Sequence, residues 1–499
     1  MQPGRERQLV TAAVMLGLFL AALEATAVAA AVPTAIGEMG GVSRYSWVFS
    51  AYLLASTTFV PLYGKLADLY GRRRVYHVAV ALFLLGSALS GLAQSLEQLI
   101  LFRFIQGVGA GGVGPIAITV TGDIYSLEER AKMQGLFSGI WAFASLVGPL
   151  LGGWITDAFS WRWIFYLNIP FGIASSLMVQ RYLREEPQRR EHRLDILGTV
   201  SLTTGVTLLL LGLIEGPSAW GWGDPRTLAV FTGSAVSLIV FFWQEQRAPE
   251  PMLPLDLFRN RLIAVSSAGS VLLGALLFSI TAFVPVFAQG VLGGTAVDAG
   301  TVLTPILIGW PISSTLTGRL MMKFGYRTFA ILGGFMMLGA GVMLALVDAG
   351  TTRHEVMLAM LIMGLGMGFN SMPYLLGVQN AVPWHLRGVA TSSVQFFRAM
   401  GGSIGVAALG ALFSVRLAQA GAGIDPNSAL DPALRAHTAP AALAKLSAAL
   451  LHGLQGVYLV LAAICVASIA VAWLFPKGSV TALIHPERDN LGDLGETKA

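Results

Sequence analysis

The chain has 499 residues, of which 55% are hydrophobic and 12% are charged, and its net charge is +5. A soluble protein carries roughly 25% charged residues, so half that share, with a mean hydropathy of +0.68, excludes an ordinary soluble protein. Apolar surface on this scale needs lipid as its solvent, and we expect a polytopic helical protein with the bilayer as partner. The positive charge is interpreted as cytoplasmic loop charge and not as nucleic-acid binding.

The first apolar run resembles two kinds of segment. Arg5 and Arg7 precede it and it ends in Ala29-Ala30-Ala31, an arrangement that a cleaved signal peptide also has. Glu24 interrupts the run, however, and many further apolar runs follow it. We therefore expect this run to be kept as the first membrane span.

Fourteen runs of mainly apolar residues are long enough to cross a bilayer as helices. They predict an all-α polytopic membrane protein whose two termini lie on the same side. The expected spans are residues 9–31, 46–66, 76–95, 99–121, 136–157, 162–182, 195–215, 227–246, 262–289, 299–318, 327–347, 355–378, 394–416 and 453–475.

The distribution of basic residues predicts the orientation. With the N-terminus inside, 23 of the 32 lysines and arginines fall on the cytoplasmic side and seven fall outside. Arg103 and Arg398 lie within spans. Because cytoplasmic loops are enriched in basic residues, we expect both termini in the cytoplasm.

One loop occurs twice. Residues 64–74 hold five charges in eleven positions, and residues 318–327 repeat their glycines and several basic positions at an offset of 254 residues. Eight spans separate the copies, where two six-helix halves would separate them by six. Repeated halves facing a central site are a common transporter plan, so the pattern predicts six plus six helices with two more inserted between.

Domain boundaries follow from this count. We expect a six-helix bundle at residues 1–190, two inserted linker helices at 191–255, a second six-helix bundle at 256–480 and a cytoplasmic tail at 481–499.

Four motifs in this order resemble those of the major facilitator superfamily, and within it the fourteen-helix drug/proton antiporter family. Residues 64–74 resemble its loop signature and residues 101–112 (LFRFIQGVGAGG) its arginine-bearing signature. Residues 139–153 resemble its antiporter signature, and residues 161–172 (WRWIFYLNIPFG) are similar to the fourteen-helix group in particular. The resemblance implies the major facilitator fold. The group usually has aspartate in the first span where this chain has Glu24.

Glu24 and Arg103 are the candidates for proton coupling. Glu24 lies about 22 Å along the first span at 1.5 Å per residue, and a charge at such depth costs roughly 2.5–3.5 kcal/mol. It should therefore be neutral, paired or in a wet cavity. Arg103 lies at a similar depth and stays charged, so it is a suitable counter-ion. The alternatives are a structural acid satisfied by its neighbours and an arginine bound to backbone carbonyls.

The resemblance implies a cytoplasmic latch around the loop at 64–74. Its residues would be Gly64, Asp68, Gly71, Arg73 and Asp123. The second copy has methionine where Asp68 would be, so we expect the latch in the first half alone. The alternative is that these are ordinary interfacial loop charges.

The fifth span carries small residues and a proline, namely Gly139, Gly148, Pro149, Gly152 and Gly153. Such faces let helices approach closely, and proline permits a bend. In the family this region is associated with export direction.

A pliable apolar pocket needs aromatic and methionine side chains. The candidates that we expect near the substrate cavity are Trp141, Phe143, Phe283, Phe287, Met367, Asn370, Tyr374 and Phe397. Such residues are common on any membrane helix, and packing or lipid contact is the alternative for each.

These features favour a monomeric, proton-coupled antiporter in a bacterial cell membrane that exports hydrophobic or cationic small molecules. The alternative is a dedicated exporter of one metabolite, antibiotic or lipid. We expect no enzyme activity, no metal site and no cofactor besides the proton, because the seven histidines are scattered and Cys465 is the single cysteine.

Overall fold

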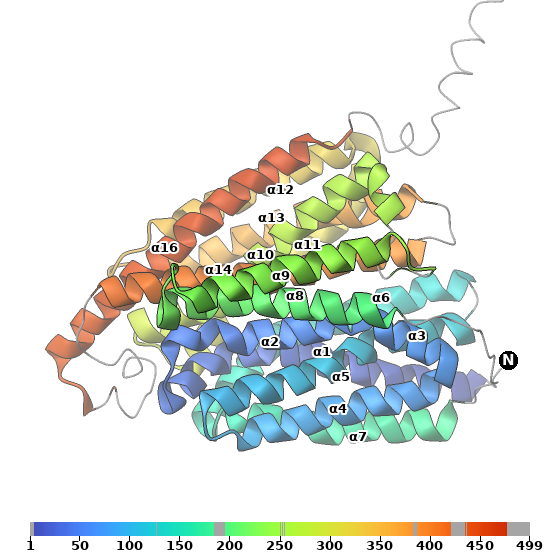
Figure 1. Ribbon diagram of the computed structural model, residues 1–499, viewed down its shortest axis with the longest axis horizontal. Coiled ribbons are helices and arrows are strands. Elements are labelled where there is room, and N and C mark those ends of the chain that lie inside the picture. The colour runs from blue at the N-terminus through green and yellow to red at the C-terminus, as the bar shows by residue number, and fades with distance from the viewer. Residues whose placement is uncertain are drawn as a thin grey trace, which may run out of the picture.

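The computed structural model describes residues 4–125, 127–183, 195–249, 251, 253, 255–382, 387–420, 435 and 437–476. In this part of the chain all regular structure is helical, as the sequence predicts (Figure 1). The α-helices are α1 Gly4–Met39, α2 Tyr45–Thr58, α3 Val60–Tyr70, α4 Arg72–Leu92, α5 Leu96–Ile124, α6 Leu127–Ala158, α7 Arg162–Tyr182, α8 Ile196–Glu215, α9 Pro225–Glu245, α10 Arg261–Val286, α11 Ala296–Phe324, α12 Tyr326–Ala345, α13 Arg353–Asn380, α14 Arg387–Gln419 and α16 Pro440–Trp473. Short helices lie at Val42–Arg44 (η1), Gly216–Trp220 (η2), Leu255–Arg259 (η3) and Phe287–Val291 (η4).

Within the described residues, twelve helices are long and apolar enough to cross a membrane. Two expected spans are not among them. The span at 46–66 is divided between α2 and α3 at Phe59, where Pro61 cannot donate the backbone hydrogen bond that would continue α2. The span at 136–157 lies within α6. The count of fourteen spans therefore stays a prediction.

The two copies of the charged loop fold alike. Gly71 separates α3 from α4 with a φ of 91°, and Gly325 separates α11 from α12 with a φ of 81°. Only glycine adopts such backbone angles at little cost. The second glycine of each copy is thus required by the sharp turn between consecutive helices.

Helices α1–α7 and α10–α16 form two groups, with α8 and α9 between them in the view of Figure 1. Helix α8 packs on α9 and touches both α2 and α14. Arg44 anchors its end through an ion pair of 3.0 Å to Glu215, and Asp195 at its start accepts a hydrogen bond of 2.9 Å from Gln244 of α9. The outward side of α9 is exposed and apolar, as expected of a helix facing lipid.

The two groups are held together at the end that the charge distribution assigns to the outside. Thr34 of α1 donates to the Gln289 side chain at 3.0 Å, and Gln289 donates in turn to the Ala30 carbonyl at 2.9 Å. Asp157, at the end of α6, accepts hydrogen bonds of 3.1 and 3.0 Å from the backbone amides of Ala296 and Val297 in α11. These contacts join the two groups at the end that is expected to face outward.

Gly153→Leu should weaken this closure. A β-carbon at residue 153 would lie 2.6 Å from the Val297 Cα, closer than side chains tolerate, so α6 and α11 must separate. Overpacking of this kind costs about 1–3 kcal/mol, and a shift of 1.4 kcal/mol changes a population about tenfold. In a Thr34→Cys, Cys465→Ser background, labelling of the new cysteine by an impermeant maleimide should accelerate about tenfold.

Gly139→Leu is the matched control, because it lies in the same helix with no atom within 4 Å of its β-carbon position. Equal labelling rates in the two variants would contradict the assignment of the α6–α11 contact to outer closure.

Candidate functional site

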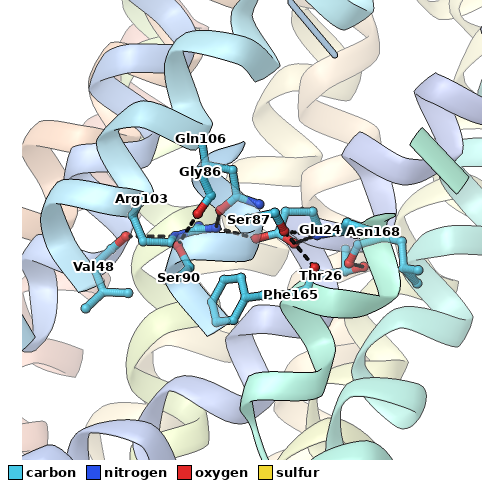
Figure 2. A network of polar contacts seen from close by, with 11 residues as sticks. Glu24, Thr26, Val48, Gly86, Ser87, Ser90, Arg103, Gln106, Phe165 and Asn168 are labelled. Carbon is cyan, nitrogen blue, oxygen red and sulfur yellow. Dashed lines mark hydrogen bonds and ion pairs between the residues drawn. The ribbon is translucent and has the colours of Figure 1, made fainter. Parts of the chain in front are cut away.

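The two ionisable residues predicted for proton coupling contact each other. Glu24 lies on α1 and Arg103 lies on α5. Both residues are buried, with exposed fractions of 1% and 2%. Arg103 Nη1 forms an ion pair with Glu24 Oε1, which Figure 2 shows at the centre of a polar network. The structure therefore brings together two residues that are 79 positions apart in the chain.

Neutral polar side chains complete the network. Asn168 of α7 donates through Nδ2 to Glu24 Oε2 at 2.5 Å and to Ser87 Oγ of α4 at 2.9 Å. Arg103 also donates to Gln106 Oε1 at 2.8 Å. Both carboxylate oxygens of Glu24 thus have donors, from two different helices (Figure 2).

Arg103 is held from the other side by backbone and aromatic groups. Its Nε donates to the Val48 carbonyl of α2 at 3.4 Å. Its guanidinium carbon lies 4.2 Å from the ring centroid of Tyr52 and 5.8 Å from that of Phe165. Because a cation is attracted to an aromatic face within about 6 Å, Arg103 keeps favourable partners even where the carboxylate is neutral.

Glycines allow the helices of the network to approach. A β-carbon at Gly86 of α4 would collide with the backbone of Gln106, and one at Gly107 of α5 would lie 2.5 Å from the Tyr52 carbonyl oxygen. The segment at 101–112 therefore contributes both to the ion pair and to helix packing. Its arginine belongs to the ion pair, and its glycines let α5 pack closely against α4 and α2.

Asn168, Gln106 and Ser87 were not predicted as site residues. Asn168 and Gln106 do lie within the segments 161–172 and 101–112. The available signal was that each is a polar side chain inside an apolar span. That signal does not identify the partner, because neutral polar side chains in spans bond to many kinds of neighbour.

The small-residue face of α6 connects α1 to the second group of helices. A β-carbon at Gly152 would meet the Ala27 backbone of α1, and Gly148 lies against Thr26. Thr26 donates to the Ala144 carbonyl of α6 at 3.1 Å. Pro149 lies against Gly300 of α11, and Gly153 against the start of α11, whereas Gly139 has no neighbour within 4 Å. Four of the five predicted residues are therefore at close helix contacts.

The predicted latch lies partly outside the described side chains. Those of Asp68 and Asp123 are not described. Gly64 has no atom within 4 Å of its β-carbon position, Gly71 forms the turn before α4, and Arg73 is half-buried. The latch stays a prediction.

The predicted cavity residues are scattered. Five of them are almost fully buried and belong to or border packed clusters of the interior: Phe283, Phe287, Met367, Asn370 and Tyr374. Phe283, for example, packs on Tyr45 and Phe413 at 5.9 and 5.8 Å between ring centroids. Phe143 is 57% exposed, Phe397 is half-buried, and the Trp141 side chain is not described. A substrate role for them stays a prediction.

The chain is similar to known membrane proteins. A model of the Major Facilitator Superfamily matches residues 14–406. "Multidrug transporter protein MdtP" of Bacillus subtilis (strain 168) is 39% identical over 412 residues, which are 82% of this chain and 76% of that protein. "Multidrug resistance protein 3" of the same strain is 35% identical over 401 residues, or 80% of this chain and 78% of that protein.

The fold has relatives among solved structures. A bacterial homolog of the human lysosomal transporter Spinster, solved in an inward-facing and unoccupied conformation, superimposes with a TM-score of 0.68. The match covers 95% of this chain and 98% of that one at 15% identity, so it bears on the fold alone. Since the family model covers most of the chain and both bacterial relatives exceed 30% identity, the chain belongs to the Major Facilitator Superfamily of membrane transporters.

Proposed function

We propose that the chain is a proton-coupled antiporter, which exports hydrophobic or cationic small molecules across the bacterial cell membrane by alternating access. Relatives that are named multidrug transporters support export. The observation that carries proton coupling is the ion pair between Glu24 and Arg103, buried inside one helix group. The proposal includes fourteen spans, cytoplasmic termini, a monomer and no cofactor besides the proton.

The two partners of the ion pair differ in what a proton does to them. Arginine stays protonated in proteins, so Arg103 is a fixed charge. Glu24 is the group that can gain a proton, and protonation removes its attraction to the guanidinium. Arg103 then retains Gln106, the Val48 carbonyl and the Tyr52 ring. Proton binding at Glu24 therefore weakens the contact between α1 and α5, while these neutral groups still stabilise the charge of Arg103.

Helix α1 carries this change towards the contact between the two helix groups. Thr26 and Ala27, next to Glu24, pack on Gly148 and Gly152 of α6. Farther along, Thr34 of α1 forms part of the outer closure. A shift of α1 would thus act on both contacts, which gives protonation a bias over the two access states.

A dedicated exporter of a single metabolite, antibiotic or lipid is the second candidate. The buried aromatic and methionine side chains of the second group do not discriminate between a multidrug exporter and a dedicated exporter. Transport assays over a panel of unrelated compounds separate the two, because a multidrug exporter accepts many of them and a dedicated one accepts one.

Glu24→Gln should abolish coupling. Glutamine has the same size and can still accept from Asn168, but it cannot bind a proton at neutral pH. In proteoliposomes, substrate-driven proton flux should fall to the level of protein-free liposomes. Glu38→Gln is the control, because Glu38 lies on the same helix but at its outer end, where it pairs with Arg162. Wild-type flux in the Glu24 variant would remove this residue from the proton path.

Arg103→Gln should destabilise the protein through the charge that it leaves behind. Breaking a buried ion pair by removing one partner costs about 3–5 kcal/mol. Adding Glu24→Gln removes the stranded carboxylate, so the double variant should unfold at a higher temperature than Arg103→Gln alone. Additive losses in thermal unfolding of the purified protein would show that the two side chains do not interact.

Asp68→Asn tests the latch. If Asp68 holds the cytoplasmic ends together in one access state, the variant should lose turnover while its substrate affinity stays within about twofold, a difference of about 0.4 kcal/mol. Met322→Leu, at the corresponding position of the second copy, should change neither quantity. Parallel losses of turnover and affinity in the Asp68 variant would argue against gating.

A further inference from the structure

Arg398 is a second arginine within a membrane-spanning helix. It lies on α14, and its backbone carbonyl packs against Gly274 of α10. Gly402, one turn later, faces Phe278 of the same helix. The residue is half-buried, so part of it stays accessible. The Nε atom of its side chain is buried, so this part of the side chain lies inside the protein.

Arg398 differs from Arg103 in having no counter-ion among the residues that the structure describes. Its Nε is buried and has no hydrogen-bond partner, and no described carboxylate lies within ion-pair distance of it. Charged side chains within spans pair with one another or face a water-filled cavity. Because no acid in the described part of the protein pairs with Arg398, its guanidinium can bind an anionic ligand.

The buried carboxylates are all engaged. Among the described residues, four acidic side chains are buried, and each has a partner of its own: Glu24 with Arg103, Asp195 with Gln244, Glu215 with Arg44 and Glu245 with the Leu253 amide. None is left to neutralise Arg398. Among the described side chains, none neutralises the charge of Arg398.

An aromatic ring lies beside this charge. The Arg398 guanidinium carbon is 5.8 Å from the centroid of the Trp310 ring on α11. The Trp310 indole donates to Ser371 Oγ of α13 at 3.1 Å, which fixes the orientation of the ring. Three helices thus present a guanidinium next to a flat apolar surface.

We propose that Arg398 and Trp310 form a subsite for a carboxylate attached to a hydrophobic, preferably aromatic, molecule. The planar guanidinium matches a carboxylate through two parallel hydrogen bonds, and the indole face receives the apolar part of the ligand. This rests on the proposed export function and adds hydrophobic acids to its substrates.

The test compares an acid with its ester. Dansyl-phenylalanine and its methyl ester differ only in the charged group, and dansyl fluorescence reports their binding to the purified full chain. The wild type should prefer the acid. Arg398→Gln should weaken acid binding at least about tenfold, a loss of about 1.4 kcal/mol, because it removes the charge-assisted hydrogen bonds to the carboxylate. It should leave ester binding unchanged.

Two further variants sharpen the result. Arg398→Lys keeps the charge but not the planar fork, so its acid affinity should fall between those of the wild type and Arg398→Gln. Arg416→Gln, on the same helix and nearer its other end, should change neither affinity. Unchanged ester binding shows that each variant is folded.

Equal affinity of the wild type for acid and ester, or an acid preference that survives Arg398→Gln, would overturn the subsite. Failure of the export proposal gives a different pattern, because binding does not require transport. The subsite stands if the acid preference depends on Arg398 while no substrate drives proton flux. The export function stands if proton flux is present and Arg398→Gln binds both probes as the wild type does.

Discussion

A charge inside a membrane protein must be matched within the protein, and the pairing of Glu24 with Arg103 is the contact on which the first helix group is built. Taking both ions out of water costs several kcal/mol each, and this is offset only where hydrogen bonds satisfy their remaining atoms. Asn168 and Gln106 do so from α7 and α5. The glycines of α4 and α5 follow from the same constraint, since without them the helices could not bring these groups into contact.

The same pair is also connected to the helices that the proposed alternating access would move. Helix α1 carries Glu24, touches the small residues of α6, and ends near the Thr34–Gln289 contact with the second group. Helix α6 in turn reaches α11 through Gly153 and Asp157. Helices α1 and α6 therefore connect the Glu24 carboxyl group to the contacts between the two groups at the end expected to face outward. The proposed coupling then requires two arrangements of packed helices and no separate signalling element.

Some of this organisation could be predicted from the sequence. Ionisable residues are rare in spans, so Glu24 and Arg103 could be paired from their depth alone. The turn glycines Gly71 and Gly325 were marked by the repeat. Asn168 could not be identified as a partner of Glu24, because a neutral side chain has no charge that would predict an oppositely charged neighbour. Phe283 was no easier, because an aromatic residue that faces a cavity and one that packs in the interior look the same in a sequence.

The sign of the substrate charge decides how the membrane potential acts on exchange. In a one-for-one cycle, a cation leaving as a proton enters moves no net charge, so only the proton gradient drives it. A carboxylate leaving as a proton enters moves two charges in the direction that an inside-negative potential favours, worth about 4.6 kcal/mol per 100 mV at about 2.3 kcal/mol per charge. Arg398, which has no acidic partner among the described residues, and Glu24, which we propose as the proton carrier, are suited to this second exchange. In the proposed exchange each ligand has its own site, and a bound acid neutralises the fixed charge of Arg398.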